Sequence, residues 1–225
     1  MKHEKLSRPR SSYALTCKTC GKETNRTMDH ECVDCYLSSH LPSKVSDDPW
    51  VWALGFRPTP TSEHEEPDPE TISLGRAIIN GKVETVSDGQ VLRIWLDENN
   101  HHDVPLTTGA LDSLAQRTRI RLGKWLVYRS RSEIDKAWKL IAKSVFDKAL
   151  GSSAKVSTAA EASSERRHVI CVYTRNYLNL EDVGRVRRLL GDMGFTEPLC
   201  YKPDIYTYLN IYSGTTKLSP CRYRE

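Results

Sequence analysis

The chain lacks any long apolar run. No stretch approaches the roughly 18 apolar residues that a membrane-spanning helix needs, so no membrane partner is expected. Charge of one sign is also scarce, since 33 Lys and Arg against 29 Asp and Glu leave a net charge of +4. This small excess of positive charge permits an anionic partner, but the chain has no dense basic tail of the kind that indicates nucleic-acid binding. The opening residues MKHEKLSRPRSSYALTCKTC contain no apolar core of a secretory signal, and we expect a cytoplasmic or nuclear protein.

Catalytic motifs are absent as well. The sequence contains no Ser/His/Asp arrangement, no phosphate-binding glycine-rich loop and no HExxH. Outside the cysteine segment, the candidate metal ligands are His101, His102 and Asp103, which follow DENN and precede Pro105. We interpret this stretch as a polar turn rather than a metal site, because adjacent histidines on a loop rarely converge on one ion. The sequence therefore favours a protein that is not an enzyme.

Composition divides the chain into segments. We predict a disordered basic arm over residues 1–16, a cysteine-bearing module over 17–37, and one domain over 47–225. The proline-rich acidic stretch 57–70 and the small, polar stretch 151–164 are predicted to be flexible loops within that domain.

Hydrophobic periodicity predicts a mixture of helices and strands. Helices are expected over residues 70–81, 108–123, 132–150 and 180–193, and strands over 90–98, 124–130, 168–174, 199–202 and 205–212. The order lacks a strict βαβ rhythm. We therefore predict an α+β domain with a mainly antiparallel sheet that is backed by helices on one face.

Four cysteines form two CxxC pairs that are separated by eleven residues: Cys17, Cys20, Cys32 and Cys35. In a chain without a signal, paired cysteines indicate a metal more often than disulfides. Two such pairs supply the four-sulfur tetrahedral shell of structural Zn²⁺, and Gly21 suits the tight turn after the first pair. We predict a zinc-ribbon-like or treble-clef-like module, with His30 outside the ligand set. Cys171 is interpreted as a core residue, and Cys200 and Cys221 have no metal-type spacing.

Basic and aromatic residues gather in a few places. Single-stranded nucleic acid needs cations for its phosphates and exposed rings for its bases. On this basis the candidate ligand-binding residues are Trp52, Trp95, Arg93, Arg119, Arg121 and Lys124, with Trp50 as a further stacking candidate. The arginine clusters, which include Arg185, Arg187 and Arg188, suit equally a solvated, salt-bridged helix face.

The closing stretch YKPDIYTYLNIY alternates at the period of a strand. Tyr206, Tyr208 and Tyr212 would then share one face, while Ile205, Leu209 and Ile211 would face the core.

Together with GKWLVYRSRSEIDKAWKLI, AKVS, RHVICVYT, VRRLL and LCYK, this stretch resembles an uncharacterised family that includes the basophilic leukaemia expressed protein. The resemblance covers roughly residues 47–225, and the cysteine module looks like an addition to it. It implies a fold similar to the cap-binding translation initiation factor, which is a curved antiparallel sheet with helices on its convex side. It also implies an RNA or cap-like ligand, for which Trp52 and Trp95 are the candidate tryptophans.

Two main function hypotheses follow, and a third, an unrecognised enzyme, rests only on the unexplained stretch His101, His102 and Asp103. In the first, the sheet domain binds RNA or a nucleotide-like ligand. In the second, the protein is a zinc-dependent adaptor that binds other proteins and no nucleic acid.

Overall fold

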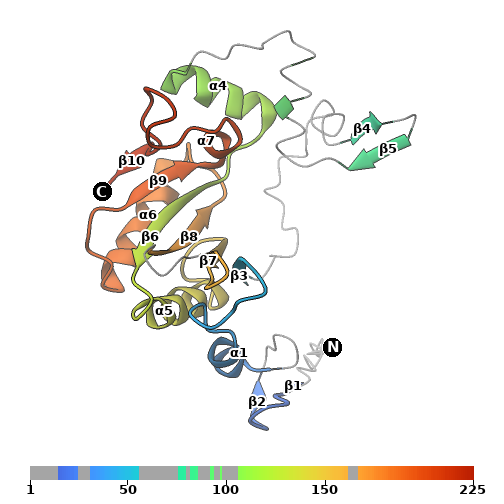
Figure 1. Ribbon diagram of the computed structural model, residues 1–225, viewed down its shortest axis with the longest axis vertical. Coiled ribbons are helices and arrows are strands. Elements are labelled where there is room, and N and C mark those ends of the chain that lie inside the picture. The colour runs from blue at the N-terminus through green and yellow to red at the C-terminus, as the bar shows by residue number, and fades with distance from the viewer. Residues whose placement is uncertain are drawn as a thin grey trace, which may run out of the picture.

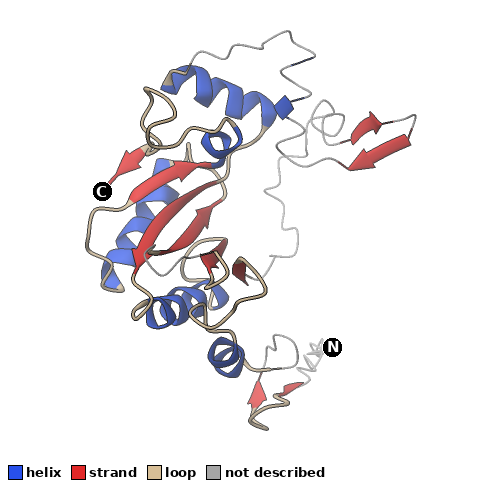
Figure 2. Cartoon of the chain, in the orientation of Figure 1, coloured by secondary structure: helices blue, strands red, loops and turns tan. Residues whose placement is uncertain are grey.

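The computed structural model describes residues 15–24, 31–55, 76–79, 82–85, 92–93, 97, 106–161 and 167–225. Figure 1 shows the course of the chain, and Figure 2 shows its helices and strands. The strands are β1 (Leu15–Thr16), β2 (Glu23–Thr24), β3 (Trp50–Leu54), β4 (Arg76–Ile79), β5 (Lys82–Thr85), β6 (Gly123–Arg129), β7 (Ser153–Ser157), β8 (His168–Thr174), β9 (Cys200–Pro203) and β10 (Tyr223–Arg224). The helices are α1 (Val33–Ser39), α4 (Thr108–Thr118), α5 (Ile134–Phe146), α6 (Leu180–Asp192) and α7 (Asp204–Tyr208).

The central element is a six-stranded sheet with the order β10-β9-β6-β8-β7-β3. All five neighbouring pairs in it are antiparallel. The prediction of an α+β protein with an antiparallel sheet is therefore confirmed. Two-stranded antiparallel pairs, β1-β2 and β4-β5, lie outside this sheet.

The helices α5 and α6 pack on one face of the sheet, which we call the helix face (Figure 1). The buried side chains of α5 recur at helical spacing, and they include Trp138 and Ile141, both fully buried. Trp125 of β6 is also fully buried, and its indole N–H donates to the carbonyl oxygen of Val183 on α6 at 3.1 Å. This bond fixes α6 against the centre of the sheet and satisfies the one polar atom of the Trp125 side chain.

The helix predicted over 180–193 is α6, and the residue before it, Asn179, is its N-cap. The Asn179 side chain accepts a hydrogen bond from the backbone N–H of Asp182 at 3.1 Å, as an N-cap residue should. At the other end, Gly194 adopts a φ of +93°, a conformation that glycine takes at little cost after a helix. The helix predicted over 108–123 ends earlier, because Arg119 turns into the left-handed region and β6 begins at Gly123.

Several predicted elements are wrong. Within the helix predicted over 70–81, Arg76–Ile79 instead forms β4, which pairs with β5. An Asn-Gly pair separates the two strands in the sequence, and this is the strongest short hairpin signal. Within the strand predicted over 90–98, residues 92–93 and 97 are helical. The predicted loop over 151–164 contains β7, which pairs with the edge strand β3 that holds Trp50 and Trp52.

Residues 205–212 do not form the predicted strand, although Tyr201, Lys202 and Pro203 before them belong to β9. Residues Asp204–Tyr208 form the short helix α7, which buries Ile205 and Tyr206. Pro203 before the helix and Asp204 in its first turn are helix-start signals, and a short apolar run fits either period. The tyrosine face is therefore divided, with Tyr206 in the core and Tyr212 45% exposed.

The cysteine module joins the sheet domain through α1, which packs against α5 (Figure 1). Leu37 of α1 belongs to the hydrophobic core of the sheet domain. Just after α1, Ser43 donates two hydrogen bonds to Asp135 on α5, from its backbone N–H at 3.0 Å and its hydroxyl at 2.6 Å. These contacts attach the module to the helix face.

A candidate metal site and a candidate ligand cleft

The four cysteines predicted to bind metal lie together. Their sulfur atoms are all within 4.8 Å of one another, and those of Cys20 and Cys32 are 3.8 Å apart. Four sulfurs around one Zn²⁺ at about 2.3 Å would be separated by about 3.8 Å, so the spacing suits a tetrahedral ion. The set therefore forms a candidate metal site. His30 lies outside the described residues.

Local structure explains how two short motifs converge. The first pair follows β1 in the β1-β2 hairpin, where Gly21 has a φ of +68° and donates its N–H to the Cys17 carbonyl at 2.9 Å. The second pair starts α1, with Cys32 at the N-cap and Cys35 in the helix. The site thus consists of a hairpin knuckle and the beginning of a helix.

Hydrogen bonds stabilise the thiolate form of Cys17. The backbone N–H of Cys32 donates to the Cys17 sulfur at 3.2 Å. This bond and one from Cys20 lower the pKa of Cys17 from 9.0 to about 6. Hydrogen bonding with the Cys32 side chain raises the pKa of Cys35. Without a metal, the pKa values of these crowded thiols therefore differ widely. A bound cation would stabilise the thiolate form of all four cysteines.

The opposite face of the sheet from α5 and α6, which we call the open face, carries a cleft of about 1230 Å³. Side chains alternate along each strand, so the residues next to the core residues point into it. On β3, Val51 and Ala53 are buried on the helix face, while Trp50 and Trp52 lie on the open face. Cationic and aromatic residues that line the cleft are Trp50, Lys124, Tyr128, Arg129, Lys155, Arg167, Lys202, Tyr212 and Arg224.

Strand register brings three lysines to the middle of this face. Lys124 on β6 lies directly opposite Lys202 on β9. Lys155 on β7 lies opposite Cys171 on β8 and Trp52 on β3. Three ammonium groups from three strands are therefore arranged around one buried thiol.

The three lysines have different partners. Lys124 pairs with the carboxylate of Asp204 and donates to the Thr207 hydroxyl at 3.3 Å. Lys155 instead lies over the rings of Trp50 and Trp52, at 4.1 and 5.1 Å. Lys202 lies over the ring of Tyr212 at 3.4 Å. Among the described residues, neither Lys155 nor Lys202 forms an ion pair with a carboxylate.

The environment disfavours the charge on these two lysines. Burial and the nearby Lys124 charge lower the pKa of Lys202 from 10.5 to about 8. Burial also lowers the pKa of Lys155. Between them, burial raises the pKa of the Cys171 thiol to about 11, so this cysteine stays neutral at pH 7. Partly desolvated cations that are not in ion-pair contact with a carboxylate are a physical sign of an anion-binding site.

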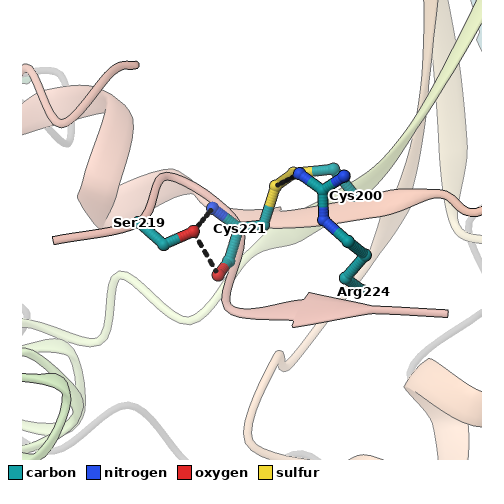
Figure 3. The surroundings of a disulfide bond; sticks show 4 residues. All are labelled: Cys200, Ser219, Cys221 and Arg224. Atoms are coloured by element: carbon teal, nitrogen blue, oxygen red, sulfur yellow. Dashed lines mark hydrogen bonds between the residues drawn. A yellow bond between two sulfur atoms is a disulfide. The ribbon is translucent and has the colours of Figure 1, made fainter. Parts of the chain in front are cut away.

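One rim of the cleft is closed by a disulfide between Cys200 and Cys221, whose Cα atoms are 5.2 Å apart. Figure 3 shows this bond beside Arg224, whose guanidinium lies 3.5 Å from the Cys221 sulfur. The bond ties the segment after α7 to β9, next to which β10 then pairs. Cysteine spacing could not reveal this pair, because a disulfide depends on the approach of the two backbones in space.

The predicted ligand residues do not all lie in the cleft. Lys124 lines the cleft, and Trp52 shares the open face of β3 with Trp50 and is 44% exposed. Arg93, Arg119 and Arg121 do not line the cleft, and Arg119 occupies the C-cap of α4. Trp95 and the His101, His102, Asp103 turn lie outside the described residues.

Among the cleft residues that sequence reasoning missed, the two central ones are Lys155 and Lys202. Lys155 lay in a stretch predicted to be a loop. A signal existed in both cases, since Lys202 alternates with the core residue Tyr201, and Lys155 alternates with Ala154 and Val156. A lysine between two core residues of a strand points to the other face of the sheet.

The arginine-rich helix is α6, and only some of its arginine contacts are the salt bridges that were expected. Arg185 pairs with Asp182 at 2.7 Å, and its guanidinium also donates to backbone carbonyls beyond α5. Arg187 donates to three backbone carbonyls around β9 and the end of the chain. Both side chains therefore hold neighbouring segments together.

Within the part of the chain that the structure describes, no helix is long and apolar enough to cross a membrane.

Fold and sites together define an α+β protein in which an antiparallel sheet presents a cationic, aromatic cleft, with a four-cysteine module attached through α1. The sequence pattern of the family described as "Basophilic leukemia-expressed protein Bles03" matches residues 98–210. The chain belongs to this family, as its sequence motifs had indicated. The matched segment contains Lys124, Lys155 and Lys202, whereas Trp50 and Trp52, Tyr212 and the four cysteines lie outside it.

Proposed function

We propose that the open face binds single-stranded RNA or a nucleotide-like ligand, without catalysis. The observation that carries this proposal is the pair Lys155 and Lys202. Each is held against aromatic rings in the cleft and has no carboxylate partner among the described residues. A phosphate would supply the missing counter-charge, and bases would stack on the rings beside it.

Competing ligands fit less well. Three acids line the cleft, Glu133, Glu161 and Glu197, against six lysines and arginines. Glu197 pairs with Arg129, and Glu133 accepts hydrogen bonds from Ser130. The cations left over therefore favour an anion over a cationic peptide. The aromatic residues favour a ligand with flat rings over inorganic phosphate alone.

The proposal extends to the cysteine module, where one Zn²⁺ would be held by Cys17, Cys20, Cys32 and Cys35. Four protein sulfurs leave no open coordination position, so this ion would be structural. It would fix the β1-β2 hairpin to the start of α1. We also propose that the sheet domain shares the fold of the cap-binding initiation factor, which the antiparallel sheet with helices on one face supports.

Fluorescence anisotropy with a labelled uridine hexanucleotide tests the RNA proposal. If Lys155 and Lys202 each neutralise one phosphate, the binding constant should fall with salt with a log–log slope of about −1.4, or about sevenfold from 50 to 200 mM. The double substitution Lys155→Gln and Lys202→Gln should remove this slope. Lys136→Gln on α5, which is exposed on the helix side, serves as the matched control.

The proposal is rejected if the wild-type protein binds no RNA. Capture of a protein from nuclease-treated extract through the cysteine module would then favour a zinc-dependent adaptor. Equal RNA affinity of the double variant and wild type would reject the assignment to this cleft.

A further inference from the structure

The cleft holds two separate places where a cation meets an aromatic ring. The first, which we call the tryptophan station, consists of Lys155 with Trp50 and Trp52. The second, which we call the tyrosine station, consists of Lys202 with Tyr212. Each station offers a positive charge for one phosphate and an aromatic surface for one base.

Strand order sets the distance between the stations. Lys202 is on β9 and Lys155 on β7, and β6 and β8 lie between them. Three strand spacings of about 4.8 Å place the two backbones about 14 Å apart. The stations are thus too far apart to act on the same base or the same phosphate.

The floor between them offers no free charge. Lys124 lies there, but it is already paired with Asp204 and only 8% exposed. Cys171 and Leu126, which face each other across β6 and β8, supply a neutral surface. A ligand that bridges the stations therefore crosses a neutral floor and makes its charged contacts at both ends.

We infer that the cleft takes a ligand with at least two bases joined through phosphates, laid across the strands with one base at each station. This inference rests on the proposed function, because it concerns the same cleft and the same anionic ligand. A mononucleotide, with one base and its own phosphate, would fill one station and leave the other empty. The shared chemistry is found both in a single-stranded oligonucleotide and in a dinucleoside polyphosphate.

Isothermal titration calorimetry tests the inference with four unlabelled probes: uridine 5′-monophosphate, the uridine trinucleotide, the uridine hexanucleotide and diadenosine tetraphosphate. Stacking of a second base should make the trinucleotide bind roughly 5- to 150-fold more tightly than the mononucleotide. Tyr212→Ala and Lys155→Gln should each reduce the trinucleotide to near the mononucleotide affinity. Tyr212→Phe, which keeps the ring, and Lys136→Gln, on the helix side, should leave it unchanged. Thermal unfolding confirms that each variant is folded.

The probes separate the outcomes. Preference for the hexanucleotide over diadenosine tetraphosphate assigns the ligand to RNA strands, and the reverse assigns it to dinucleoside polyphosphates; both support two stations. Equal affinity of the mononucleotide and all the longer probes would overturn the inference while the proposed function stands. Failure of all four probes to bind would reject the proposed function itself.

Discussion

Ligand binding should depend on the protonation of Lys202. Its pKa is lowered to about 8 in the free protein, by burial and by the charge of Lys124. A bound phosphate would favour the charged ammonium and raise this pKa toward its ordinary value of 10.5. Binding is therefore coupled to proton uptake above pH 8.

The sign and size follow from this linkage. Below pH 8 the ammonium is already present, so affinity should be flat. Above pH 8 the free protein loses the proton that the complex keeps, and affinity should fall by up to about tenfold per pH unit. Between pH 7 and 9 the expected loss is about tenfold. The groups that face Lys202 are Lys124 on β6, Cys171 on β8, Asp204 on α7 and Tyr212. The pKa of Cys171 is about 11, outside this window.

Lys202→Arg is the decisive variant, because a guanidinium stays charged throughout the range. Anisotropy titrations of the hexanucleotide at pH 7, 8 and 9 should show the falling affinity for wild type and a clearly shallower fall for Lys202→Arg. The reasoning is refuted if wild-type affinity is constant to pH 9, or if the affinity of the variant falls as steeply.

In the free protein the same lowered pKa of Lys202 means that unfolding takes up protons above pH 8. The free energy of unfolding should therefore gain a rising contribution from Lys202 between pH 8 and 10.5.

Three further predictions concern other parts of the molecule. Wild-type protein should bind one Zn²⁺ by atomic absorption; Cys20→Ser should lose it and the control Cys171→Ser should keep it, whereas retention by Cys20→Ser would contradict the four-sulfur site. Cys221→Ser opens a disulfide that links residues 21 apart, and the free energy of unfolding in urea should drop by about 3 kcal/mol; an unchanged midpoint would show that the bond does not form. Gly151→Ala would place a Cβ against the backbone carbonyl of Tyr173 and should cost about 1–3 kcal/mol, while Gly109→Ala in α4 meets no atom within 4 Å and should be neutral or stabilising by up to about 1 kcal/mol; similar effects of both in thermal unfolding would contradict the packing described.

Prediction from sequence succeeded where local signals were strong. The strands around Trp125 and Ile170, the amphipathic α5 and the Asn179 cap of α6 all followed from short-range patterns. It failed where a pattern was short or ambiguous. The run after Pro203 fits both strand and helix periods, and the packing of Ile205 and Tyr206 into the core selects the helix. Arginine clusters drew attention in the sequence, yet Arg119 and Arg121 lie away from the cleft.

The sequence by itself determined the family motifs, the α+β class and the set of four cysteines, because each depends on residues that are close along the chain. Tertiary structure alone decided the cleft. Lys155 and Lys202 are 47 positions apart, and the register of β3, β7, β8, β6 and β9 places them on one face with Trp50. Tyr212 reaches the same cleft from the segment after α7. The same holds for the bond between Cys200 and Cys221. Strand pairing between distant segments fixes which side chains meet, and no local periodicity contains that information.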